Sequence, residues 1–242
     1  MVTAQLGDFT FLLFTGSCSL LAFKMVKRVG SHGKLGLMCA GMFASMLFIF
    51  LGIVADCVYV IVFRVATPMP SVADLLSFLG YACAVVSTVQ FLWYFRSAFG
   101  QWRYKLAPLV GVIVACPNLV LSHPNLATQT PLIADATWLA YPILDGLLSV
   151  LAIMMLMLFS GGIIFSPWRW FAVGLILITI ADTVIGLGNV QGWSQLIQPF
   201  YLFYLWGYIC LGLGFSRMAK MKRLHPLEQD YYKAKLMRPL DS

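Results

Sequence analysis

Seven apolar segments follow one another along the chain, separated by polar or basic stretches. A helix needs about 20 predominantly apolar residues to cross the roughly 30 Å hydrocarbon core of a bilayer, and these segments are long enough or nearly so. The period-two alternation expected of a transmembrane β-barrel is absent. The pattern predicts an all-α bundle of seven membrane-spanning helices, at residues 9–26, 35–63, 75–95, 106–121, 136–159, 168–187 and 196–215.

The composition indicates that lipid is the solvent for most of the chain. Of 242 residues, 61% are hydrophobic and 10% are charged, whereas soluble domains contain about 45–50% apolar and about 25% charged residues. A soluble domain of this size has too little interior to bury so much apolar surface. The composition therefore excludes a soluble enzyme, a nucleic-acid-binding domain and a disordered regulator, and it predicts a multi-pass protein of the cell membrane.

The lysine and arginine residues predict the orientation of the helices. If the N-terminus lies outside, all 16 basic residues except Arg64 fall in cytoplasmic loops or in the C-terminal tail. This asymmetry satisfies the positive-inside rule, and an even number of spans would destroy it. We therefore expect a seven-helix domain at residues 1–217 and a short basic cytoplasmic tail at residues 218–242. The net charge of +7 is interpreted as a collar that faces anionic lipid headgroups, not nucleic acid.

Three acidic residues, Asp56, Asp145 and Asp182, lie within the predicted spans. An ionised aspartate at the centre of a bilayer costs roughly 2.5–3.5 kcal/mol on an insertion scale. No Lys, Arg or His lies at their depth, so we expect the three side chains to face the bundle interior, either hydrogen-bonded or protonated. Two interpretations stay open, a structural hydrogen bond between helices and a site for a ligand or a cation.

Three other acidic residues, Asp8, Asp74 and Asp135, lie at the outer ends of predicted spans. Asp74 and Asp135 come directly before apolar runs. At that position a carboxylate caps the helix N-terminus and interacts favourably with the positive end of the helix dipole. For these two residues the sequence predicts a structural role.

Polar and aromatic side chains recur at helical spacing in the spans that surround the buried acids. The seventh span carries a glutamine and three tyrosines on one face, the third carries Gln90 on a polar face, and Tyr141 precedes Asp145 by one turn. These groups predict a pocket with aromatic walls that opens to the outside; the alternative is that tyrosine hydroxyls join helices. The predicted ligand-binding residues are Asp56, Tyr81, Gln90, Tyr141, Asp145, Asp182, Gln198, Tyr201, Tyr204 and Tyr208.

An Ala-Asp pair followed by a Gly-Tyr pair occurs twice in the chain. The two copies are Ala55-Asp56 with Gly80-Tyr81, and Ala181-Asp182 with Gly207-Tyr208. Both copies run in the same direction across the predicted bilayer, so they are consistent with a parallel internal repeat.

The motifs of several membrane and catalytic families are missing. The seventh span has no lysine for a retinal Schiff base, and the Asp-Arg-Tyr and Asn-Pro-x-x-Tyr signatures of eukaryotic G-protein-coupled receptors are absent. The three histidines fall in loops or the tail, and the six cysteines show no CxxC spacing. No HExxH or GxSxG motif is present. We predict a protein that is not an enzyme and needs neither a metal nor a cofactor.

Two stretches of the chain carry a family resemblance. Residues 70–81 read PSVADLLSFLGY and residues 140–148 read AYPILDGLL, and a further Ala-Asp pair follows in the sixth span. This succession resembles the multi-pass sensor modules that precede diguanylate cyclase and histidine kinase domains in prokaryotes. The resemblance covers residues 70–217 and implies a sensory or scaffolding role. The positions that it carries over are Asp74, Tyr81, Tyr141, Pro142, Asp145 and Asp182.

The short predicted tail departs from that family, in which the last span leads into a cytoplasmic output domain. We therefore predict a stand-alone membrane sensor that binds an unknown small ligand from outside and acts through a partner protein at its cytoplasmic loops and tail. A non-catalytic accessory subunit of a larger membrane complex is one alternative. A transporter of small solutes or ions, using the buried acids and the repeat, is another.

Overall fold

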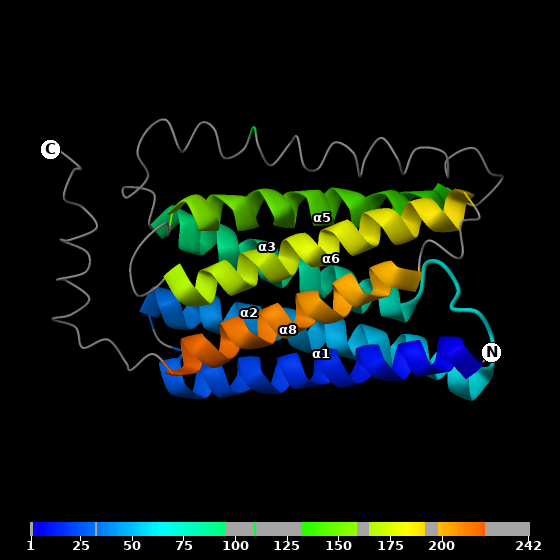
Figure 1. The fold of residues 1–242 in the computed structure, drawn as a ribbon, viewed down its shortest axis with the longest axis horizontal. Helices are drawn as coiled ribbons and strands as arrows, with labels where there is room; N and C mark the ends of the chain where they lie inside the picture. Colours follow the sequence, from blue (N-terminus) through cyan, green and yellow to red (C-terminus); the bar gives the residue numbers. More distant parts are fainter. Residues whose placement is uncertain are drawn as a thin grey trace, which may run out of the picture.

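The computed structural model describes residues 2–31, 33–94, 109, 132–158, 165–191 and 198–220 (Figure 1). This part of the chain contains helices and turns but no strand. A π-helical segment, η1 (Val58–Phe63), extends the second helix, and a 3₁₀ turn, η4 (Gln198–Phe200), precedes the last one. The long helices are α1 (Val2–Val29), α2 (Gly33–Cys57), α3 (Val72–Tyr94), α5 (Leu132–Leu158), α6 (Phe165–Gln191) and α8 (Tyr201–Lys220).

Five of the described helices, α1, α2 with η1, α3, α5 and α6, are long and apolar enough to cross a membrane. Helix α8, which contains tyrosine, tryptophan and basic residues, is not among the five. Large apolar side chains such as Leu20, Val86 and Trp206 are exposed on the bundle surface, where lipid would cover them. The fold is thus a helical bundle of the membrane type, and the predicted fourth span, residues 106–121, lies outside the described residues.

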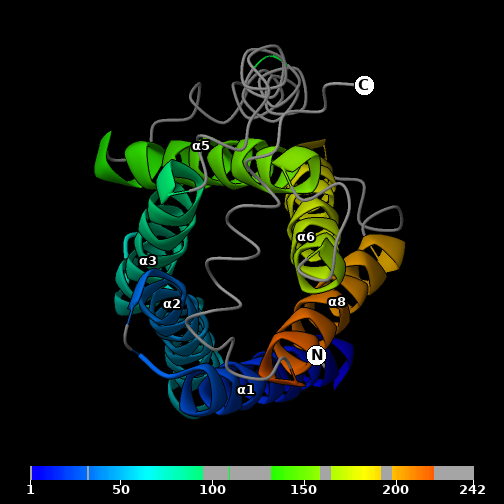
Figure 2. The ribbon, with the colours of Figure 1, turned by 90° about the vertical axis from the view of Figure 1, so that its left-hand side faces the viewer.

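The described long helices form a closed ring in sequence order, in which α8 returns to contact α1 (Figure 2). Neighbours in the ring are antiparallel except at two contacts, α3 with α5 and α8 with α1. At the first of these, Asp74 contacts Tyr141 and Tyr81 contacts Asp145. Residues later in α3 thus contact residues later in α5, so the two helices run in the same direction. The end of α3 and the start of α5 therefore lie at opposite ends of the bundle.

The two parallel contacts are built alike and divide the ring into halves, α1–α3 and α5–α8. In each, one aromatic ring on the first helix of a half packs against two rings on the last helix of the other half. The ring pairs are Phe11 with Tyr201 and Tyr204 at 5.9 and 5.3 Å, and Tyr141 with Phe78 and Tyr81 at 4.9 and 6.2 Å. Phe11 thus corresponds to Tyr141, and the halves are related by an approximate two-fold axis along the bundle, as in a parallel repeat.

The register of this repeat differs from the one that the dipeptide motifs predict. Tyr81 corresponds to Tyr204, one turn before Tyr208, because both pack against equivalent rings. A serine near the middle of the first helix of each half donates a hydrogen bond to the second helix of that half. These bonds give the register between the second helices of the two halves. They run from Ser19 to the Met46 carbonyl oxygen (2.9 Å) and from Ser149 to Thr179 Oγ1 (2.8 Å). Asp182 therefore corresponds to Ile49, and the match with Asp56 is wrong by about two turns.

Basic and acidic side chains occupy different parts of the described bundle. Arg64 lies at the end where η1 finishes, and the other basic residues lie at the opposite end, where α1 and α8 finish and α2 and α6 begin. The acids Asp56, Asp74, Asp145 and Asp182 lie between the middle of the bundle and the Arg64 end. The residues of the basic end are Lys24, Lys27, Arg28, Lys34, Arg169, Arg217 and Lys220.

Candidate ligand pocket

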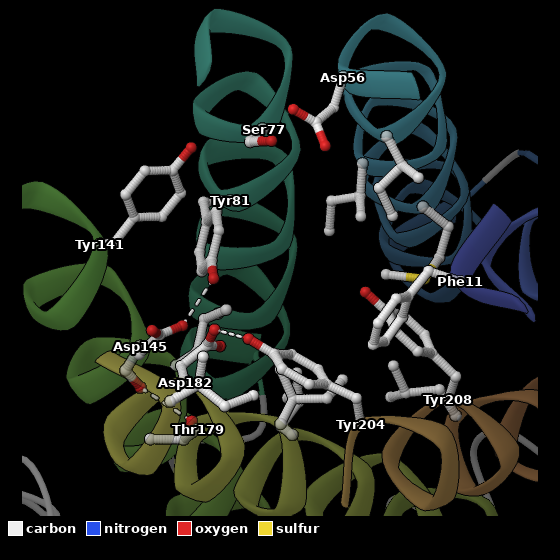
Figure 3. Close-up of a pocket in the computed structure, with 18 of the residues that line it drawn as sticks. Phe11, Asp56, Ser77, Tyr81, Tyr141, Asp145, Thr179, Asp182, Tyr204 and Tyr208 are labelled. Carbon is white, nitrogen blue, oxygen red and sulfur yellow. Dashed lines mark hydrogen bonds between the residues drawn. The ribbon is translucent and has the colours of Figure 1, made fainter. Parts of the chain in front are cut away.

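A cavity of about 320 Å³ lies inside the ring, in the part that holds the acidic residues (Figure 3). All six long helices contribute to its described lining, which is mostly apolar and contains three carboxylates and five tyrosines. The chain thus places on one cavity side chains from helices that are far apart in the sequence. The predicted site residues that line it are Asp56, Tyr81, Tyr141, Asp145, Asp182, Tyr201, Tyr204 and Tyr208.

Two of the predicted site residues, Gln90 and Gln198, are not among the described residues that line the cavity. Gln90 is exposed on the outside of α3, because nine residues separate it from Tyr81 and at 3.6 residues per turn the two point to opposite faces. Gln198 lies in η4, and its side chain is outside the described part of the structure.

Asp145 and Asp182 are neighbours on one side of the cavity, from α5 and α6 respectively (Figure 3). Asp145 is only 3% exposed and accepts a hydrogen bond of 2.6 Å from the Tyr81 hydroxyl. Asp182 accepts a hydrogen bond from the Tyr204 hydroxyl. Each carboxylate has room for further donors, since an ionised carboxylate offers about four lone-pair positions. The two acids thus form a paired acceptor group that faces the cavity.

Asp56 lies on α2, apart from this pair and toward the Arg64 end of the bundle (Figure 3). It accepts a hydrogen bond from the hydroxyl of Thr67, in the connection between η1 and α3. Among the described residues, no group of three or more His, Cys, Asp or Glu side chains is arranged to hold a metal ion. The three acids therefore share a cavity without forming a metal-ligand cluster.

Asp74 confirms the predicted helix cap. One of its carboxylate oxygens accepts hydrogen bonds from the Ser71 backbone N–H and hydroxyl, both at 2.8 Å, and the Ser71 hydroxyl accepts one from the Asp74 backbone N–H at 3.3 Å. This is a capping box at the start of α3. The other oxygen accepts a 2.7 Å hydrogen bond from the Tyr141 hydroxyl on α5, a contact that the sequence did not predict. The Asp135 side chain is outside the described part.

Glycines that precede two of the pocket tyrosines bring neighbouring helices close together. A Cβ atom on Gly80 would lie 3.0 Å from the carbonyl oxygen of Ser45 on α2, and one on Gly207 would lie 3.0 Å from that of Gly174 on α6. Small residues commonly allow such close packing between membrane helices. The glycine of each Gly-Tyr pair thus packs against the preceding long helix, while the tyrosine after it lines the cavity.

Other lining residues were not predicted, and some had a readable signal. Thr179 lies one turn before Asp182 on α6, and this spacing predicts that the two side chains share a face. Its hydroxyl donates toward the Asp145 backbone carbonyl oxygen at 3.5 Å. Ser77 precedes Tyr81 by one turn in the same way. Phe11 was not predicted because it is itself apolar, although Thr15 lies one turn later on the same face of α1.

No family model matches the chain, and comparisons with curated proteins and with solved structures give no significant match. The resemblance to prokaryotic sensor modules therefore stays a prediction. Any function must be inferred from the cavity, from the hydrogen bonds of its carboxylates and from the charge distribution of the bundle.

Proposed function

We propose that this protein is a receptor-like membrane protein that binds a small ligand in the cavity. The observation that carries the proposal is the convergence of three carboxylates and five tyrosines on one cavity within an apolar bundle. Polar and ionisable groups at membrane depth are costly and are commonly retained for function. A mostly apolar pocket with a few convergent polar groups is the usual form of a small-molecule site.

We propose seven spans with the N-terminus outside and the C-terminus in the cytoplasm. Two features support this topology. The first is that α1 and α8 are parallel and that α3 and α5 are parallel, which fits one further crossing between residues 95 and 131. The second is the separation of charges, which puts the basic end in the cytoplasm according to the positive-inside rule. In this orientation the cavity lies in the outer part of the bundle.

A ligand in this cavity would contact both halves of the ring, and we propose that this is how binding is transmitted. The α3–α5 contact is held by the hydrogen bonds from Tyr81 to Asp145 and from Tyr141 to Asp74. A ligand that engages Asp145 competes with or reinforces one of these bonds, and so it changes how the halves meet. The helices that move continue to the basic end, where a cytoplasmic partner protein would detect the change.

Ligand-dependent stabilisation of the purified protein tests this proposal. The thermal unfolding midpoint of the full chain in detergent would be measured with a panel of small amines, carboxylic acids, sugars and amino acids. We expect at least one saturable stabilisation, because a ligand that binds only the native state raises its stability. The stabilisation should be lost in Asp145→Ala and Asp182→Ala and kept in Gln90→Ala, which changes an exposed residue outside the cavity. Equal stabilisation of all four proteins would rule out this cavity as the site.

The internal repeat favours a second candidate function, transport of a small solute. Many secondary transporters consist of two repeats with the substrate site at the interface between them, and this cavity lies between the two halves of the ring. Flux of a stabilising compound into proteoliposomes would identify a transporter. Binding without flux would favour the receptor.

A further inference from the structure

We infer that the ligand of this cavity is a small organic cation, an amine or a quaternary ammonium compound. This inference rests on the proposed ligand-binding function and adds the chemical class of the ligand. It follows from three properties of the described lining: its charge, its aromatic walls and its size.

The described lining contains three carboxylates and no Lys, Arg or His. Within a low-dielectric bundle a buried carboxylate needs hydrogen bonds and a positive partner, or it must take up a proton. Hydroxyl donors are present, since Tyr81, Tyr204 and Thr67 each donate to one of the acids. A hydroxyl group satisfies a lone pair but carries no charge. A cation in the cavity supplies the missing positive charge.

The aromatic side chains suit an organic cation better than a bare metal ion. A cationic group within about 6 Å of a ring centroid is attracted to the face of the ring. Rings from both parallel contacts surround the cavity, with Phe11 and Tyr204 on one side and Tyr81 and Tyr141 on the other. In the part of the chain that the structure describes, the acids do not form a group of three or more ligands that could hold a metal ion. A nitrogen cation that carries carbon substituents uses both kinds of lining, the carboxylates and the rings.

The size of the cavity limits the ligand to a compact molecule. At about 320 Å³ it lies at the small end of the range of about 300–1,000 Å³ for small-molecule sites. Asp145 and Asp182 lie on one side and Asp56 lies apart from them (Figure 3). We expect the cationic group to contact the Asp145–Asp182 pair, and the body of the ligand to extend toward Asp56.

Two series of probes of matched shape test the charge requirement directly. The first is choline, 3,3-dimethylbutan-1-ol and 3,3-dimethylbutanoate; the second is 2-phenylethylamine, 2-phenylethanol and phenylacetate. Each would be titrated against the full chain in detergent at constant ionic strength, with the thermal unfolding midpoint as the readout. We expect the cation of at least one series to bind at least ten-fold more tightly than its neutral and anionic counterparts.

Variants locate the charge that the cation recognises. Asp145→Asn and Asp182→Asn should each weaken cation binding at least ten-fold, because they keep the shape and remove the charge. If either variant fails to fold, Asp56→Asn, at a partly exposed position, gives the same test with a smaller loss. Gln90→Ala is the control and should leave binding unchanged.

The remaining outcomes separate this inference from the proposed function. In one outcome, a neutral or anionic probe binds as tightly as the cation of the same series, and Ile53→Trp, which fills the cavity, abolishes that binding. The inference about charge would then be wrong, whereas the assignment of the ligand site to this cavity would hold. If no probe of either series stabilises the protein, the inference is overturned. Stabilisation by a compound of the broader panel would still support the proposed function, and its absence there as well would remove both.

Discussion

The two parallel contacts between the halves of the ring occupy equivalent places but are held by different forces. At the α3–α5 contact, which we call the polar seam, two tyrosine hydroxyls donate across the contact, Tyr81 to Asp145 and Tyr141 to Asp74. At the α1–α8 contact, which we call the aromatic seam, Phe11 takes the place of the tyrosine. Its ring packing and a hydrogen bond of 3.1 Å from the Cys18 thiol to the Tyr208 carbonyl oxygen hold the helices together. The repeat thus preserves the shape of the packing and changes its chemistry.

The two acids of the polar seam belong to different halves, Asp74 to the first and Asp145 to the second. Thr15 follows Phe11 by four residues, as Asp145 follows Tyr141, so Thr15 holds the place of Asp145 in the first half. Its hydroxyl bonds back to the Phe11 carbonyl oxygen of its own helix at 2.8 Å and does not reach α8. The charge on this side of the cavity therefore comes from the second half alone. The comparison indicates that the acids are additions to a common packing plan and are not required by it.

Placing an acid in the aromatic seam should have the largest effect. Thr15 is 1% exposed, and its hydroxyl donates to a carbonyl oxygen of its own helix. We expect Thr15→Asp to lower the free energy of unfolding by about 2.5–3.5 kcal/mol, the cost of an aspartate at mid-bilayer. Thr15→Asn, with the same shape and no charge, is the matched control and should cost less. Both would be measured by thermal and denaturant unfolding in detergent, and an equal loss would mean that shape, not charge, separates the seams.

Filling the helix contacts next to the tyrosines should have a similar effect in both halves. Gly80→Val and Gly207→Val place side chains against backbone carbonyl oxygens of α2 and α6, and we expect each to cost about 1–3 kcal/mol through overpacking. Gly212→Ala is a milder control, because its Cβ would meet the flexible end of Leu21 at 3.3 Å. A large loss at one glycine alone would show that the two close helix contacts do not restrict packing to the same extent.

Removing the two corresponding hydroxyls distinguishes a bond across a seam from a bond within one half. Tyr81→Phe breaks the polar seam, whereas Tyr204→Phe breaks a bond to Asp182 between α8 and α6 of the same half. We expect each to lower stability by about 0.5–1.5 kcal/mol, the net value of a hydrogen bond. Only Tyr81→Phe should speed the cross-linking of cysteines introduced on the cavity sides of α3 and α5. Equal cross-linking rates in both variants would contradict the division into two halves.

Exchanging phenylalanine and tyrosine at the two corresponding positions, Phe11 and Tyr141, should have the smallest effect on stability. Phe11→Tyr adds a hydroxyl beside a cavity that can hydrate it, so we expect a change within about 0.5 kcal/mol. Tyr141→Phe removes the bond to Asp74 and should cost slightly more. Thermal unfolding of both variants compares the two changes, and a larger loss for Phe11→Tyr would show that the aromatic seam cannot accept a polar group.

The helices and the convergence of the acids could be predicted from the sequence, because both follow from the cost of polar groups in lipid. The lengths of the apolar segments predicted the long helices. The lack of basic partners predicted that Asp145 and Asp182 face the bundle interior, and both line the cavity. The cap at Asp74 also followed from local sequence, since this acid comes directly before an apolar run.

The seams and the register of the repeat could not be predicted, because they depend on which helices meet. The bond from Tyr141 to Asp74 joins residues that are 67 positions apart, and no local pattern gives that pairing. The dipeptide match gave the wrong register because Ala, Gly and Tyr are common in membrane helices and carry little positional information. Gln90 was predicted because it lies on a polar face of the third span, but its spacing from Tyr81 turns that face away from the cavity.

The most direct test of the account is the side of the membrane from which the cavity can be reached. Cys57 lies in the cavity lining and reports access without any substitution. A membrane-impermeant methanethiosulfonate that carries a trimethylammonium group would be applied to intact cells and to inverted vesicles, and modified residues would be located by mass spectrometry. We predict that Cys57 reacts in intact cells and is protected in inverted vesicles. Modification of Cys57 in inverted vesicles alone would contradict an outward-facing cavity in a bundle with its basic end in the cytoplasm.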